Sequence, residues 1–204
     1  EGTIRRLEPG FRVKGEYMSM PSVLWVFTSL IAFWGFLLVG LPGSVAATEP
    51  PVRIAITTVL VEHYLDVNRQ WIAYVGEKLG RQTELVQRRS YKEISDLLER
   101  RQVDVAFVCG LPYVIDREKF GLELLVAPLV YEKPIYYSYV IVPRDSPVER
   151  FEELRGKRYA FSDPLSNSGH LVPRYMLAGM GETPDSFFKR YIFTYSHSDK
   201  VEAL

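Results

Sequence analysis

The chain has 204 residues, of which 47% are hydrophobic, and its 25 basic side chains balance 25 acidic ones. This is the composition of an ordinary globular protein, and without a basic excess it gives no support to a nucleic-acid partner. Cys109 is the only cysteine, which excludes an internal disulfide and a cysteine-based zinc cluster.

The N-terminal region predicts export. Val23–Leu41 is a run of 19 residues without a charge, preceded by Arg12 and Lys14 and followed by small residues at Val45 and Ala47. This order is typical of a secretory signal with cleavage after Ala47. The run is also long enough to span a bilayer, so a retained membrane anchor is the alternative. In both cases we expect the chain from residue 48 onward to be periplasmic or otherwise extracytoplasmic, with membrane contact only through residues 23–41 if they are uncleaved.

The region that follows the predicted signal is nearly neutral. Residues 1–47 hold four of the basic and three of the acidic side chains, so the remainder carries 21 and 22. An anion site there must therefore be local rather than a broad basic field. Because the chain begins with Glu1 and ends in the first turns of an expected helix at 198–204, we expect it to be a fragment.

Strands and helices alternate in the first half of this region. Val52–Thr58 alternates apolar and polar residues as a half-buried strand does, and Glu62–Leu79 has apolar residues at helical spacing. A strand at Thr83–Gln87, a helix at Tyr91–Arg101 and a buried strand at Val103–Val108 follow. This order predicts a parallel sheet with helices on its faces. Ligands bind such sheets at the carboxyl ends of the strands, which here are followed by the loops 57–62, 88–91 and 109–113.

The second half predicts another α/β unit. A short helix near 114–119, a strand at 122–129 and a long aromatic strand at 135–142 lead to a proline-rich turn. After that turn we expect a helix at 148–154, a strand at 158–161, a capped helix, a helix at 185–188 and a strand at 191–195. We therefore predict a first lobe over 48–142 and a second over 143–204. Clefts between lobes are preferred sites for small ligands.

The turn Ser166–Ser168 is the strongest candidate for a binding site. Three residues of the kind that cap helices stand between the end of a predicted strand and a run of helical spacing. A helix N-terminus has unpaired N–H groups and a partial positive charge, which favour an oxyanion. An ordinary capped helix is the alternative for this stretch alone.

The sequence lacks the patterns of common catalytic sites. A serine hydrolase would have a Gly-x-Ser-x-Gly turn, but Leu165–Gly169 lacks the first glycine. His197 and Asp199 form a pair that nothing in the sequence places beside Ser168, and no metal-ligand spacing or phosphate-binding loop is present. We therefore expect no enzyme activity, no metal and no cofactor.

Six segments in order resemble one family, the periplasmic phosphonate-binding proteins, which are the substrate-binding components of ABC importers. These segments are Gln102–Phe107, Gly110–Val114, Lys133–Val142, Asp145–Pro147, Leu154–Pro164 and Ser166–Leu177. The resemblance runs from about Val52 to the end of the chain. It implies an α/β, two-lobed periplasmic-binding-protein fold of type II, the venus flytrap, with the second lobe incomplete in this chain.

The resemblance also implies which residues hold the ligand. In the family a serine- and threonine-rich turn grips the phosphonate oxygens, two tyrosines of the first lobe line the site, and a histidine contributes. The matching residues here are Ser166, Asn167, Ser168, Tyr91, Tyr136 and His197. The family usually has threonine where this chain has Asn167, which replaces a hydroxyl by an amide. From the residues alone, Tyr91 would serve equally well as a packing residue at the start of a helix.

The implied function is capture of a phosphonate, phosphate or similar phosphorus oxyanion in the cleft between the lobes and its delivery to the membrane permease of an ABC transporter. The alternative keeps the same binding step but retains residues 23–41 in the membrane. The domain would then be the extracytoplasmic ligand sensor of a receptor such as a histidine kinase.

Overall fold

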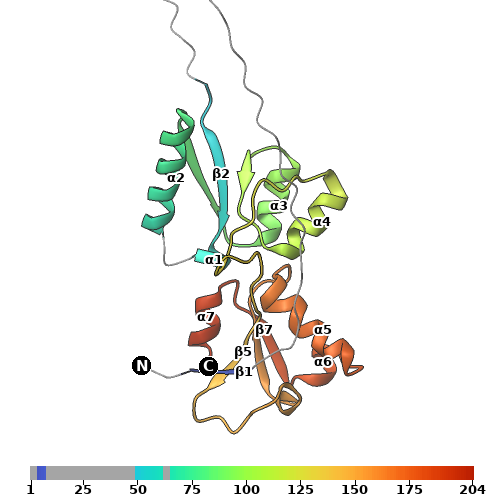
Figure 1. The fold of residues 1–204 in the computed structure, drawn as a ribbon. Helices are drawn as coiled ribbons and strands as arrows, with labels where there is room; N and C mark the ends of the chain where they lie inside the picture. The colour runs from blue at the N-terminus through green and yellow to red at the C-terminus, as the bar shows by residue number, and fades with distance from the viewer. Residues whose placement is uncertain (1–3, 8–48, 62–64) are drawn as a thin grey trace, which may run out of the picture.

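A computed structural model describes residues 4–7, 49–61 and 65–204, and these residues form two α/β lobes, each with its own hydrophobic core (Figure 1). The predicted signal or anchor at 23–41 lies outside the described residues. Within the described ranges no helix is both long enough and apolar enough to cross a membrane.

The first lobe is built on a three-stranded parallel sheet with the order β3-β2-β4. Strand β2 (Val52–Thr57) is central, with β3 (Thr83–Arg88) on one side and β4 (Val105–Ala106) on the other. Its inner position explains why residues 54–57 are all buried. The parallel sheet predicted from the alternation of strands and helices is confirmed.

Helices cover the two faces of this sheet. The short α1 (Thr58–Val61) follows β2 directly, α2 (Leu65–Leu79) packs on β3, and α3 (Tyr91–Glu99) and α4 (Gly110–Phe120) lie together on the other side (Figure 1). Trp71 of α2 meets Phe107 edge to face, with ring centroids 5.0 Å apart. This contact ties α2 to the chain that leads from β4 into α4.

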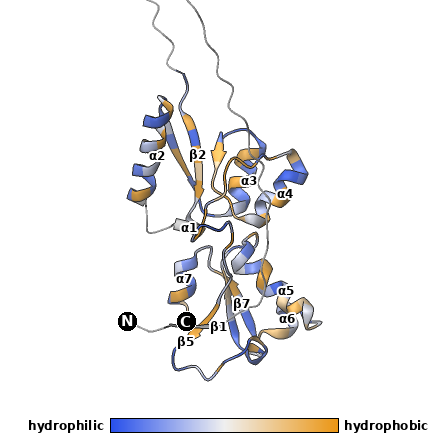
Figure 2. Cartoon of the chain, in the orientation of Figure 1, coloured by the Kyte–Doolittle hydropathy of each residue, from blue (hydrophilic) through white to orange (hydrophobic). Residues whose placement is uncertain are grey.

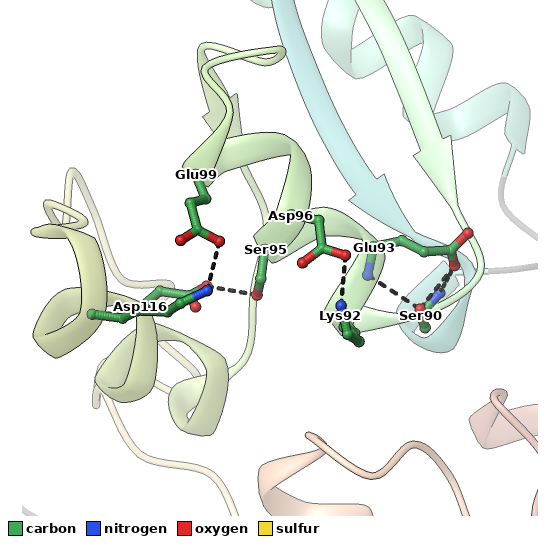
Figure 3. A network of polar contacts seen from close by, with 8 residues as sticks. Ser90, Lys92, Glu93, Ser95, Asp96, Glu99 and Asp116 are labelled. Atoms are coloured by element: carbon green, nitrogen blue, oxygen red, sulfur yellow. Dashed lines mark hydrogen bonds and ion pairs between the residues drawn. The ribbon is translucent and has the colours of Figure 1, made fainter.

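Polar contacts fix the start of α3 and hold it against α4. The Oγ of Ser90 accepts a hydrogen bond from the N–H of Glu93 at 3.2 Å, and the Glu93 carboxylate accepts one from the N–H of Ser90 at 2.9 Å (Figure 3). Ser95 donates to the buried carboxylate of Asp116 at 2.6 Å. Because these bonds fix the first turn of α3, they also fix the position of Tyr91, its first residue.

The second lobe contains two two-stranded sheets. Strands β6 (Arg158–Phe161) and β7 (Arg190–Phe193) are parallel, whereas β5 (Val140–Pro143) pairs antiparallel with β1 (Ile4–Leu7), a strand that the sequence did not predict. The helical elements are the 3₁₀ turn η1 (Phe151–Leu154), the π turn η2 (Asn167–Leu171), α5 (Val172–Gly179), α6 (Pro184–Phe187) and α7 (His197–Glu202).

The core of the second lobe is mainly aromatic. Phe161 is fully buried, and its ring lies within contact distance of the rings of Tyr159, Phe188 and Phe193. The hydrophobic residues of β5 (orange in Figure 2) pack in this same core. The division after residue 142 stays a prediction, and β5 is described here with the second lobe.

Of the two strands predicted before the proline-rich turn, one is absent from the described structure and the other is shorter than expected. The described structure has no strand over 122–129, where Leu124, Leu125 and Val126 are more than half exposed, and the long strand expected at 135–142 begins only at Val140. Alternation predicts which side chains share a face, but a strand also requires a neighbour that supplies hydrogen bonds. Within residues 122–139 the described pairing is a single bridge, Val130 with Lys133.

Candidate functional site

The serine-rich turn after β6 forms the base of the site. Ser166 is buried, and its Oγ accepts a hydrogen bond from the N–H of Gly169 at 3.0 Å, as an N-cap does. The helix then starts as the π turn η2 instead of the expected α-helix. Pro173 has no N–H to offer the carbonyl of Gly169, which accepts instead from the N–H of Ser162 at 3.4 Å.

Gly169 is required by close packing. A Cβ atom at this position would overlap the Oγ of Ser162 and approach the Oγ of Ser166. The turn can therefore lie against the end of β6 only because residue 169 has no side chain. In this position the N–H of Asn167, the first residue of η2, reaches the first lobe, where it donates to the Sγ of Cys109.

Asp163 connects the two lobes. Its carboxylate is almost fully buried and accepts hydrogen bonds from the N–H of Leu165 at 2.7 Å and from the N–H of Tyr91 at 3.2 Å. Burial raises the pKa of Asp163, and the two N–H donors oppose that shift. No local pattern of the sequence singles out this residue, although its place directly after the end of a strand is a signal for a ligand-binding edge.

Tyr91 presents an unused hydroxyl to the same region. The residue is fully buried, and its hydroxyl makes no hydrogen bond of good geometry among the described residues, since the neighbouring thiol of Cys109 interacts with it only weakly. Burial raises its pKa far above the usual value, and the neighbouring Cys109, Asp163 and Tyr136 raise it further. The phenol is therefore protonated at neutral pH and available as a donor.

Asn167 meets the first lobe with its backbone and with its side chain. Its side-chain amide donates to the hydroxyl of Tyr136 at 3.0 Å, and its backbone N–H donates to the Sγ of Cys109 at 3.3 Å. Tyr136 is half exposed, and partial burial of its hydroxyl raises its pKa. The amide that replaces the family's threonine hydroxyl is thus in direct contact with a predicted ligand-binding tyrosine.

Cys109 is the N-cap residue of α4. The loop predicted over 109–113 is wrong, because α4 begins at Gly110 and the helix expected from 114 therefore starts four residues earlier. The thiol of Cys109 lies 3.5 Å from the carbonyl of Leu165, and burial raises its pKa. A Cβ atom on Gly110 would lie 3.7 Å from the amide of Asn167. The N-terminus of α4 in the first lobe therefore faces the N-terminus of η2 in the second.

Ser168 and His197 line a cavity that is separate from the contacts around Cys109 and Asp163. Lys200 and residues of β5 and β6 also line this cavity, which has a volume of about 480 Å³. Burial lowers the pKa of His197 to about 4 and that of Lys200 to about 8, so the imidazole is neutral at pH 7. The carbonyl of Ser168 accepts a hydrogen bond from Ser138 at 2.7 Å.

A second cavity, of about 360 Å³, lies between the lobes. Arg88 and Arg89 line it from the first lobe, at the carboxyl end of β3, and Tyr195 and Asp199 line it from the second. The guanidinium of Arg89 lies over the ring of Tyr195, 5.4 Å from its centroid. The guanidinium groups of Arg88 and Arg89 therefore place positive charge beside the start of α3.

Of the six residues predicted to bind ligand, the structure gathers four around Cys109 and Asp163. These four are Tyr91, Tyr136, Ser166 and Asn167. Ser168 adjoins them in sequence but also faces the 480 Å³ cavity, and His197 lies in that cavity. The binding roles of all six stay predictions. Among the described residues no group of three histidine, cysteine or acidic side chains is placed to hold a metal ion.

Comparison with known proteins gives a family model and a relative that agree with each other. Residues 55–204 match the family model described as the periplasmic phosphonate substrate-binding protein of ABC transporters. The phosphonates-binding periplasmic protein of Escherichia coli K12 is 25% identical over 154 residues, which are 72% of this chain and 46% of that protein.

Two solved structures have a similar fold. PhnD1 from Prochlorococcus marinus, in complex with methylphosphonate, has a TM-score of 0.58 at 16% identity over 74% of this chain and 58% of its own. A binding-protein component of an ABC phosphonate transporter from Pseudomonas aeruginosa has a TM-score of 0.57 at 20% identity over 76% and 53%. The chain thus spans about half the length of these relatives. The predicted two-lobed α/β fold is confirmed.

Proposed function

The chain belongs to the family of periplasmic substrate-binding proteins of phosphonate ABC transporters, and from this premise we propose that it captures a phosphonate or a similar phosphorus oxyanion between its lobes. We further propose that it acts in the periplasm and delivers the oxyanion to the membrane permease of an ABC importer. The site would bind the ligand without changing it chemically.

One observation supports this proposal, namely that Asn167 at the start of η2 contacts the first lobe through both its backbone N–H and its side-chain amide. Asn167 already contacts both Tyr136 and Cys109 across the gap between the lobes. Backbone N–H groups at a helix start favour an anion. Hydrogen bonds to a charged oxygen are shorter and stronger than bonds between neutral groups, and they strengthen further where water is excluded.

The arrangement supports a closing motion as the binding step. The buried bond from the N–H of Tyr91 to Asp163 joins the lobes beside the site. A ligand that contacts both lobes binds the closed form more tightly than an open one, and it shifts the equilibrium by that difference in affinity. Closure would be the signal that a permease recognises.

His170, the histidine closest in sequence to the serine turn, is held by packing within the second lobe. Its Nδ1 lies 2.6 Å from the carbonyl oxygen of Pro164. Its ring packs edge to face on Phe161 and Phe193.

Calorimetric titration of the full-length protein tests the proposal. The ligands are methylphosphonate, 2-aminoethylphosphonate, phosphite and phosphate, with sulfate as the control oxyanion. We expect one phosphorus oxyanion to bind with a Kd of about 1 μM or tighter. A folded protein that produces no heat with any of the four would contradict the proposed function.

A further inference from the structure

The turn Ser166–Ser168, here named the oxyanion turn, has an unusual hydrogen-bond acceptor for one of its N–H groups. The N–H of Asn167, the first residue of η2, donates to the Sγ of Cys109 across the two lobes at 3.3 Å. A neutral thiol is a weak acceptor, and burial raises the pKa of this one and so keeps it neutral. A strong donor at a helix start is therefore paired with a poor partner.

The hydroxyl of Tyr91 is the second observation. It is fully buried, makes no hydrogen bond of good geometry among the described residues, and has only a weak polar interaction with the thiol of Cys109. Buried hydroxyl groups without a partner are uncommon because their desolvation is not compensated. An acceptor that reached Cys109 would therefore also find an unused donor.

A second helix start points to the same place. Cys109 is the N-cap residue of α4, an 11-residue helix, and its side chain makes no capping hydrogen bond. Gly110 lies against the amide of Asn167, with 3.7 Å between that amide and a Cβ built on the glycine. The positive ends of two helical segments, one from each lobe, thus converge beside a single thiol.

We propose that Cys109 occupies the position of one ligand oxygen and becomes a specificity-determining contact when the oxyanion binds. The oxyanion displaces Sγ as the acceptor for the N–H of Asn167 and accepts a hydrogen bond from the hydroxyl of Tyr91. The thiol is moved aside and lies against the remaining substituent on phosphorus. This inference rests on the proposed function and adds a residue to its site.

The chemistry of the thiol predicts which substituent it accepts. A thiol is a weak donor and behaves largely as a small apolar group. It therefore suits a methyl group or a hydrogen on phosphorus better than the fourth oxygen of phosphate, which would lose its hydrogen bonds to water. A serine hydroxyl at the same position would donate to that oxygen.

Alkylation of Cys109 tests the displacement. N-ethylmaleimide adds across its double bond to the thiol without a leaving group, and mass spectrometry of the Cys109 peptide measures the rate. At a methylphosphonate or phosphate concentration of about 100 times its Kd, only about 1% of the protein is unoccupied, and we expect labelling to slow by about 100-fold. Sulfate at the same concentration is the control and should leave the rate unchanged.

Calorimetry on the same sample distinguishes failure of this inference from failure of the proposed function. If an oxyanion binds but the labelling rate of Cys109 does not change, the inference is wrong and the proposed function stands. If none binds to the folded protein, the proposed function is wrong and the inference is wrong with it.

A comparison of variants tests the selectivity. We expect Cys109→Ser to shift the ratio of affinities toward phosphate over methylphosphonate by about tenfold, since a buried polar contact discriminates ligands strongly. Cys109→Ala, which removes the thiol without supplying a donor, should not shift the ratio toward phosphate. Equal ratios in the parent and in Cys109→Ser would overturn the proposed contact.

Discussion

Two helix starts in this protein are capped by serine and differ at the third helical position. Helix α3 has Ser90 as its N-cap and Glu93 at the third position, whereas η2 has Ser166 as its N-cap and Gly169 at the corresponding position. In α3 the Glu93 carboxylate accepts the N–H of Ser90 and so places a negative charge at the helix start. In η2 the glycine supplies no charge.

The difference indicates why one helix start is structural and the other is a candidate binding site. A helix start that carries its own carboxylate has less to gain from an external anion. The start of η2 has only the Ser166 hydroxyl and the thiol of Cys109 as acceptors for the N–H groups of Gly169 and Asn167. An oxyanion would supply the charge that η2 lacks.

The largest expected effect comes from removing both hydroxyl groups of the oxyanion turn. Ser166→Ala combined with Ser168→Ala should weaken oxyanion binding by about 3 kcal/mol or more, because bonds to a charged acceptor contribute about 1.5–3 kcal/mol each. Titration calorimetry measures the loss. Thr183→Ala, which removes the N-cap of α6 in the second lobe, is the matched control, and it should lower the free energy of unfolding by about 1 kcal/mol without changing Kd. Equal affinity in the double variant and the parent would mean that the turn is only a cap.

Gly169→Ala tests whether the close approach of η2 to β6 is needed. The added methyl group would overlap Ser162, so we expect a loss of about 1–3 kcal/mol in the free energy of unfolding, as for other overpacked sites. Denaturant unfolding measures it. Gly179→Ala in α5 is the control, since a Cβ there meets no atom within 4 Å. Comparable stability of the two variants would show that the turn relaxes freely.

Tyr91→Phe removes only the unused hydroxyl. We expect oxyanion binding to weaken by about 1.5 kcal/mol, the lower end for a bond to a charged group, with little loss of stability because the hydroxyl makes no hydrogen bond of good geometry among the described residues. Tyr159→Phe is the control, because Tyr159 stacks on Phe188 in the second core. A Tyr91→Phe protein with the affinity of the parent would remove Tyr91 from the site.

The smallest expected effect concerns pH. His197 has a pKa near 6.5 when unfolded and about 4 when folded, so the unfolded chain binds more protons between these values and stability falls as pH drops from 6.5 to 4. We expect His197→Gln to reduce this loss by about 1 kcal/mol, after allowance for partial exposure. Unfolding at pH 7 and pH 4.5 measures the difference. An identical pH dependence in parent and variant would show that His197 is not buried as described.

The sequence predicted the local features well and the contacts between distant residues poorly. Alternation and capping patterns located β2, β3 and β6 and identified Ser166 as a helix start, because these signals depend on neighbouring residues. The contact of Cys109 with Asn167 joins residues 58 positions apart, and that of Tyr91 with Asp163 joins residues 72 positions apart. No local pattern reports such pairings.

Two further differences between the predicted and the observed secondary structure have identifiable physical causes. The π turn was missed because it depends on Pro173 together with the close packing of Gly169, a combination that helical spacing does not show. The strand expected at 122–129 was wrong because its apolar run was interpreted as a strand, whereas in the described residues it has no neighbouring strand to pair with.

The edge-to-face contact between Trp71 and Phe107 gives this protein an optical reporter. The sequence contains three tryptophans, and Trp71 is the only one after residue 47. Phe107 lies two residues before Cys109, so a movement of the thiol that shifts this segment would change the surroundings of the indole. Once residues 1–47 have been removed, the tryptophan emission of residues 48–204 would come from Trp71 alone, which contacts the segment that leads to Cys109. Ligand capture could then be followed in stopped-flow experiments without attaching a dye.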